Sequence, residues 1–131
     1  MEEIHWIYLV DYTGTPVEIY LKNKKEILRP NQAVISNFLF GIKEINKDLE
    51  ENIVNKTEIN DHYFFFIEEK KKEFFIIMKS EKSLFIEKFL NHILRIKDRF
   101  IEIFQMNQIL TQERKIKLLK EFKKEVKEYI L

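Results

Sequence analysis

Three histidines, His5, His62 and His92, are the residues of this chain best suited to bind a metal ion or to transfer a proton. No two of them stand at the spacing of four residues that places a pair of ligands on one helix face, and no HExxH sequence occurs. The absence of cysteine excludes thiolate metal sites and disulfides. We therefore expect structural or exposed histidines and no metal site.

Two pairs of adjacent glutamates, Glu50 with Glu51 and Glu68 with Glu69, are the other candidates for acid–base chemistry. Neighbouring side chains diverge, so neither pair forms the converging carboxylates that a general acid and base require. The chain contains no GxSxG, Walker A or GxGxxG sequence, and its two glycines leave little material for a phosphate-binding loop. The sequence therefore predicts no catalytic residue, no cofactor-binding residue and no enzymatic activity.

The length and composition of the chain are those of one soluble domain. Its 131 residues are enough to bury a core, and 45% of them are hydrophobic, which is too apolar for a disordered chain. No window approaches the ~18 uninterrupted apolar residues of a membrane span, and the opening MEEIHW lacks the features of a targeting signal. We expect a single cytoplasmic domain, residues 1–131. Its net charge of +1 gives no strong field for nucleic acid.

Two stretches that must position any site, HYFFFIEE from His62 and FFIIMKS from Phe74, are apolar at both odd and even positions. Side chains alternate between the two faces of a strand, so each of these strands needs protein on both sides. The helices before and after them are the candidates for this cover. Covered rings cannot stack on bases, which also argues against a nucleic-acid partner.

Three further strands are predicted. Residues Ile4–Asp11 are again apolar on both faces, which indicates an interior strand. Residues Val17–Lys22 alternate, with three apolar side chains on one face, and the lysines at and after its end are typical of a protected edge strand. A short strand is expected around Thr57–Asn60 in a mostly polar segment.

Three amphipathic helices account for most of the remaining chain. The first begins after Asn31 as N-cap, the second after Ser80 or Ser83, and the third after Thr111. Apolar residues mark one face of each helix at helical spacings. They are Val34, Ile35, Phe38, Leu39, Ile42, Ile45 and Leu49 in the first; Phe85, Ile86, Phe89, Leu90, Ile93, Leu94, Ile96, Phe100, Ile101 and Phe104 in the second; and Ile116, Leu119, Phe122, Val126 and Ile130 in the third.

The resulting order of elements, β-β-α-β-β-β-α-α, resembles that of the longin domain of the roadblock/longin superfamily. The residues that carry the resemblance are VDYTGTPVEIY at the first two strands, the amphipathic helix after Asn31, and the paired strands HYFFFIEE and FFIIMKS. The resemblance implies an α+β, longin-like fold: a five-stranded mixed or antiparallel sheet with one helix on one face and two helices on the other. Roadblock domains normally place a helix before the first strand, and none is predicted here.

The same resemblance implies a non-catalytic platform for protein–protein interaction in vesicle trafficking or GTPase regulation. Its partner would be a small Ras-like GTPase or another longin or roadblock chain, and no cofactor is implied. No SNARE coiled-coil segment follows, so the chain looks similar to the stand-alone longin proteins of archaea, including the Asgard lineages.

Two surfaces are candidates for docking a partner or a second copy in a homodimer. The first is the edge strand with Val17, Ile19 and Leu21, whose outer backbone groups could pair with another chain. The second is the exposed side of the first helix, where Phe40 stands off the main apolar stripe. Phe40 is either an anchor for a partner or a residue packed at the rim, and the sequence favours neither interpretation.

The basic tail offers an alternative function. From Thr111 onward there are seven basic and four acidic residues, a net charge of +3 on an amphipathic helix. Residues 112–131 could therefore attach a membrane-peripheral module to anionic lipid, the only membrane route besides a partner. Opposite charges four residues apart, such as Glu113 with Lys117 and Lys124 with Glu128, instead favour an ordinary solvated face.

Overall fold

A computed structural model describes residues 3–11, 16–22, 54–69, 74–105 and 111–131. Its contacts divide the chain into two compact units, Glu2–Lys82 and Ser83–Leu131. The single domain expected from the sequence stays a prediction. The helix expected after Asn31, and with it Phe40, lies outside the described residues.

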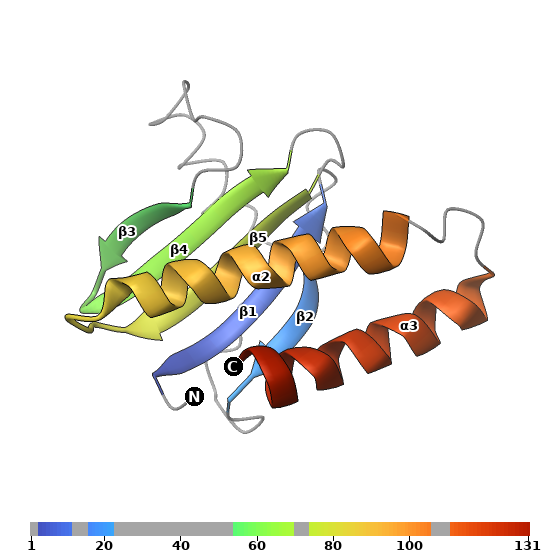
Figure 1. The fold of residues 1–131 in the computed structure, drawn as a ribbon. Helices are drawn as coiled ribbons and strands as arrows, with labels where there is room; N and C mark the ends of the chain where they lie inside the picture. Colours follow the sequence, from blue (N-terminus) through green and yellow to red (C-terminus); the bar gives the residue numbers. More distant parts are fainter. Residues whose placement is uncertain (1–2, 12–15, 23–53, 70–73, 106–110) are drawn as a thin grey trace. The chain divides into compact units, whose positions relative to one another are not determined.

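The first unit is built on a five-stranded antiparallel sheet in the order β2-β1-β5-β4-β3 (Figure 1). Its strands are β1 (Ile4–Asp11), β2 (Pro16–Leu21), β3 (Asn55–Ile59), β4 (His62–Glu69) and β5 (Phe74–Glu81). The α+β class, the five strands and the interior position of β1 are therefore confirmed, and so is the edge position of β2 among the described strands. Which helix covers which face of the sheet stays a prediction.

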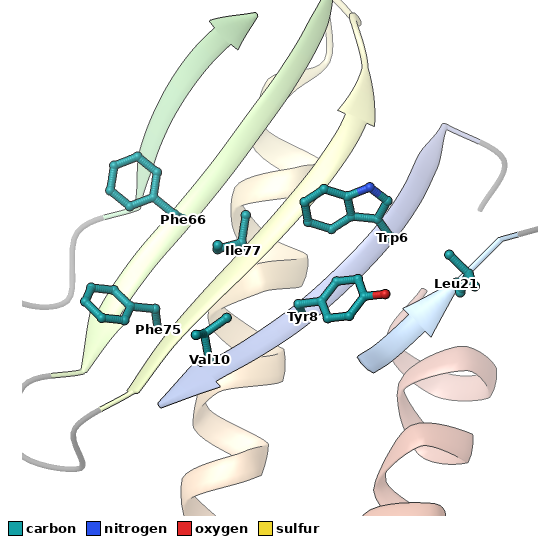
Figure 2. Packing of buried hydrophobic residues seen from close by; sticks show 7 residues of the cluster. All are labelled: Trp6, Tyr8, Val10, Leu21, Phe66, Phe75 and Ile77. Carbon is teal, nitrogen blue, oxygen red and sulfur yellow. The ribbon is translucent and has the colours of Figure 1, made fainter. Parts of the chain in front are cut away.

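Both faces of the sheet are apolar, as the double-sided strands predict. A cluster of seven buried residues from four neighbouring strands forms one face (Figure 2). Trp6 stands in this cluster with its ring 5.3 Å from that of Tyr8 and 6.0 Å from that of Phe64, both edge to face. The alternate residues Phe65, Ile67 and Ile76 are fully buried as well. Each such side chain contributes about 1.5–3 kcal/mol on burial.

The β3–β4 hairpin turns through two residues, Asn60 and Asp61, which both have positive φ, at 49° and 65°. Ile59 and His62 are paired on either side of them. Two left-handed residues define a type I′ turn, whose twist matches that of the strands it joins. The short strand accordingly ends before Asn60, which the sequence had placed inside it. His62 begins β4.

The second unit contains α2 (Ile86–Gln105), α3 (Gln112–Glu125) and the π-helical turn η1 (Val126–Ile130). Thr111 caps α3 as predicted, because its hydroxyl accepts a hydrogen bond from the Arg114 amide at 3.2 Å. Ser80 is wrong as a cap, since it is buried inside β5. The Ser83 hydroxyl accepts from the Phe85 amide at 3.1 Å, one residue before the helix begins.

The buried stripes of the helices are partly as predicted. Phe89, Ile93 and Ile96 of α2 are fully buried, and so is Phe122 of α3. Two residues predicted to lie on the buried apolar faces of the helices are exposed instead. Phe85 precedes α2 and is 73% exposed, and Ile116 is 56% exposed. Among the described residues, no helix is long and apolar enough to cross a membrane.

The turn conformation predicts a difference between two substitutions of Asn60. Asn60→Ala should lower the free energy of unfolding by about 1 kcal/mol, because alanine tolerates positive φ less well than asparagine does. Asn60→Gly should cause no loss, since glycine adopts this conformation without steric cost. Chemical denaturation of the two variants measures the difference, and an equal loss in both would contradict the backbone explanation.

Candidate protein interaction surfaces

One end of the sheet gathers polar residues that are far apart in sequence. Ile4 is paired with Ser80 and Trp6 with Lys79, so His5 is an extra residue, a bulge in β1 against β5. Bulges re-aim side chains. The His5 ring lies edge to face on that of His62 at 5.1 Å, and its Nε2 is 3.5 Å from Oε1 of Glu81. The close approach of these two histidines could not be predicted, because spacing along the chain does not reveal a bulge.

Lys82 ties the same end of the sheet to the β3–β4 hairpin. Its ammonium group forms an ion pair with Glu58 of β3 and lies 3.5 Å from Oδ1 of Asp61 in the turn. The hydrogen bond to Glu58 is the main cause that raises the pKa of Lys82, and Asp61 adds to it. The positive charge on Lys82 therefore stabilises the hairpin.

These polar residues form no metal centre. In the described parts of the chain, no group of three or more histidine, cysteine, aspartate or glutamate side chains is placed to hold a metal ion. The rings of His5 and His62 are in contact, although the spacing of the histidines in the sequence predicted no such pair. Glu68 and Glu69 are consecutive in β4, one half-buried and one buried, while Glu50 and Glu51 lie outside the described residues.

The predicted docking strand β2 is an edge strand with an irregular backbone. Tyr20 is paired with Ile7 and Glu18 with Tyr8, so Ile19 is an extra, bulged residue. The bulge puts Val17 in register with Leu9 and Leu21 with Trp6. Residues 6 and 9 of β1 point to opposite faces, so Val17 and Leu21 do not share one face as predicted.

The side chains predicted to dock a partner on β2 are mostly buried. Ile19 is 3% exposed and Leu21 is 9% exposed, while Val17 is half-buried. Pro16, at the start of the strand, has no amide hydrogen to donate. A bulge and a proline are two devices that blunt an edge, so β2 offers a partner only a short, interrupted run of backbone.

The other edge strand among the described strands, β3, is regular. Five consecutive residues pair one to one with β4 without a bulge. In a two-residue hairpin the residues flanking the turn, Ile59 and His62, exchange both backbone hydrogen bonds, and bonding alternates from there. The amide and carbonyl groups of Glu58 and Lys56 therefore point away from β4. Both residues are exposed, and the Lys56 ammonium lies 4.6 Å from the centre of the Tyr63 ring.

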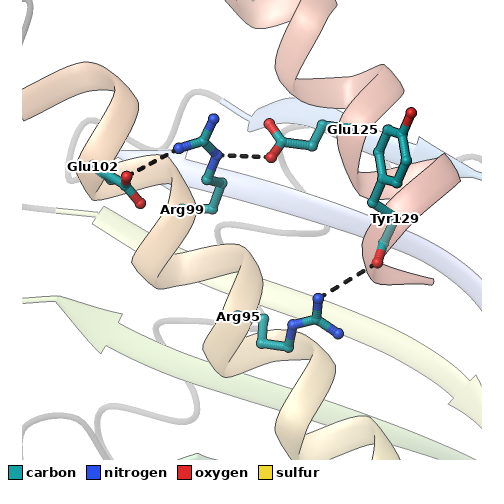
Figure 3. A network of polar contacts seen from close by, with 5 residues as sticks. All are labelled: Arg95, Arg99, Glu102, Glu125 and Tyr129. Atoms are coloured by element: carbon teal, nitrogen blue, oxygen red, sulfur yellow. Dashed lines mark hydrogen bonds and ion pairs between the residues drawn. The ribbon is translucent and has the colours of Figure 1, made fainter.

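In the second unit, an ion pair and an aromatic contact join α2 to α3. Nε of Arg99 donates to Oε1 of Glu125 at 2.8 Å, and its Nη1 is 3.1 Å from Oε1 of Glu102 (Figure 3). The bond to Glu125 raises the pKa of Arg99, which keeps it cationic. The Phe100 ring packs edge to face on Phe122 at 5.6 Å.

An open groove of about 340 Å³ lies beside this network. Its apolar lining comes from Ile103 of α2 and from Leu118 and Phe122 of α3. Its charged lining is Arg99, Glu102, Glu121 and Glu125. We call this site the hairpin groove. The sequence did not reveal it, because it depends on which turns of the two helices face each other.

Ile116 and Lys120 are exposed on the side of α3 turned away from the groove. Lys123 is half-buried and stands on the same side, three residues after Lys120, and we call these three residues the outer face. The oppositely charged residues four apart along this helix, Glu113 with Lys117 and Lys124 with Glu128, are all exposed. Among the described residues, no ion pair engages Lys120 or Lys123 of the outer face.

Comparison with known proteins assigns this chain to no family. No protein-family model matches the sequence, and no curated protein matches it either.

The raised pKa of Lys82 predicts a pH-dependent effect of its removal. A lysine whose pKa is higher in the folded state stabilises the fold below its unfolded pKa, and this contribution disappears as pH rises through the folded value. Lys82→Met should thus melt slightly earlier than the wild type at neutral pH, with the difference vanishing at strongly alkaline pH. Lys115→Met, which removes an exposed lysine of α3, is the control and should melt like the wild type. A deficit for Lys82→Met that persists at alkaline pH would contradict the ion-pair origin.

Proposed function

We propose that this protein is a non-catalytic docking platform that binds another protein by adding a strand to its sheet. The observation that carries the proposal is the regular, exposed edge at β3. Strand addition gains affinity from backbone hydrogen bonds and therefore needs consecutive outward-facing amide and carbonyl groups. Lys56 and Glu58 supply such groups on β3, whereas Pro16 and the bulge at Ile19 interrupt them on β2.

The side chains along β3 suit a reversible contact. Lys56 and Glu58 are charged and exposed, which opposes uncontrolled aggregation of an open edge. Ile59 is 38% exposed at the end of the strand and offers an apolar contact beside the polar backbone. Such an edge would bind a strand whose charges complement Lys56 and Glu58, and it would repel strands with like charges at these positions.

The partner follows from the resemblance to longin domains. A small Ras-like GTPase, or another longin or roadblock chain, is the partner class that this resemblance implies. The five-stranded antiparallel sheet followed by two helices supports the resemblance at the level of element order. A GTPase could join the sheet through an edge strand of its own.

A pull-down of small Ras-like GTPases, loaded with GDP or a non-hydrolysable GTP analogue, tests the partner class. We expect capture of at least one GTPase, and a preference for one nucleotide would distinguish an effector from a scaffold. A purified longin or roadblock chain in the same assay tests the second partner. Capture of none of these proteins would contradict the proposed partner class.

Two substitutions at Lys56 test the edge itself. Lys56→Pro removes an amide hydrogen that points away from β4, so the hairpin should fold while a partner strand loses a hydrogen bond and meets the proline ring. We expect at least a tenfold loss of affinity, which corresponds to about 1.4 kcal/mol. Lys56→Ala removes the same side chain, keeps the amide, and should bind far better than Lys56→Pro. Equal binding by the two variants would place the partner elsewhere.

A further inference from the structure

The hairpin groove has the shape and charge of a receptor for a long cationic side chain. Three carboxylates and one guanidinium line it, and Arg99 is already bonded to Glu125 and Glu102. The groove thus keeps a net negative charge above an apolar floor that includes the fully buried Phe122. Lysine combines an aliphatic stem with a charged head, so it can satisfy both parts of such a groove.

The size of the groove limits what can enter it. The open groove of about 340 Å³ has room for one or two side chains that project from a neighbouring surface. The occupant must therefore present an isolated apolar residue next to positive charges on an exposed face.

The outer face of α3 has this composition. Ile116 is 56% exposed, and Lys120 and Lys123 follow it on the same side of the helix. At 3.6 residues per turn, the groove-lining Leu118, Phe122 and Glu125 lie about half a turn around the helix from the outer face. One α3 helix therefore carries a receptor surface on one side and a complementary surface on the other.

We propose that the hairpin groove of one copy of this chain receives Ile116 and Lys120 from the outer face of a second copy. The contact is charge-complementary. We assign Glu121 as the groove carboxylate that pairs with Lys120 of the second copy, because no described ion pair engages Glu121. Since the two surfaces are different and face opposite ways, the contact is heterologous. Heterologous contacts that do not close into a ring extend into chains.

The contact between the hairpin groove and the outer face is independent of the docking edge at β3, because it uses residues of the second unit alone. The same contact differs from attachment to a membrane through residues 112–131, since an anionic surface has no affinity for a groove lined by carboxylates. Membrane binding would use the outer face and leave the groove unchanged. The groove variants below therefore separate the two possibilities.

Sedimentation velocity of the whole chain over a wide range of concentrations tests the proposal. We expect the average mass to rise from that of the 16.1 kDa monomer without stopping at a dimer. The association should weaken as salt is raised, because exposed charges are screened. A wild-type protein that stays monomeric at every concentration in low salt would overturn the proposal.

Charge reversals identify the two surfaces. Glu121→Lys alters the groove and Lys120→Glu alters the outer face, so each variant alone should remain monomeric. An equimolar mixture should regain association, because each reversed charge then meets its opposite. Glu128→Lys and Lys115→Glu carry the same charge changes outside both surfaces and should associate like the wild type. Circular dichroism confirms that all four variants fold.

Two results would count against the second copy as occupant. Failure of the mixture to associate, with both variants folded, would show that Glu121 and Lys120 do not meet. The second result is flotation of monomeric wild type with phosphatidylserine vesicles. If Lys120→Glu loses this flotation and Glu121→Lys keeps it, the outer face binds a membrane. In either case Glu121→Lys should still capture a GTPase, because this substitution leaves β3 unchanged. Lys56→Pro, which alters β3, should still lose that capture.

Discussion

The antiparallel pairing of β1 with β5 is the interaction on which the sheet depends. It joins the β1–β2 pair, near the start of the chain, to the β3–β4–β5 meander, whose strands follow one another closely. Seven residue pairs hold it, and apolar side chains stand on both of its faces. β1 and β5 are both interior strands, which leaves β2 and β3 as the edges of the described sheet. The edges that a partner could reach are thus set by a pairing between two interior strands.

The two edges are treated differently by the sequence. Pro16 and the bulge at Ile19 interrupt β2, and the side chains of Ile19 and Leu21 are buried. β3 keeps a regular backbone, and within the described residues its protection is that it is short and charged. Bulges and prolines prevent pairing with any strand, whereas charges prevent pairing only with strands that do not match them. A protein that binds a partner at one edge would be expected to place the bulge and proline on the other edge, β2, and charged residues on the binding edge, β3.

Much of the sheet could be predicted from the sequence, and the finer geometry could not. The apolar runs at Ile4–Asp11 and Phe74–Glu81 identify interior strands because no single wet face is possible for them. The bulges at His5 and Ile19 have no such signature, and each moves side chains to places that alternation does not predict. The turn at Asn60 had a local signal, since Asn followed by Asp favours positive φ. The hairpin groove had none, because Arg99 and Glu125 meet across 26 residues.

The two proposed surfaces rely on different physics, and this difference decides what each can do. Hydrogen bonds between strands at β3 are directional, depend little on salt, and read the backbone of a partner rather than its sequence. Contacts between the hairpin groove and the outer face of α3 rest on partly exposed charges, which are individually weak and screened by salt. The proposed docking at β3 would therefore gain its affinity from directional backbone hydrogen bonds. The proposed contact of the helical hairpin is suited to a weak association that depends on local concentration. A platform with both could bind one partner firmly and gather copies of itself only where many are already held together.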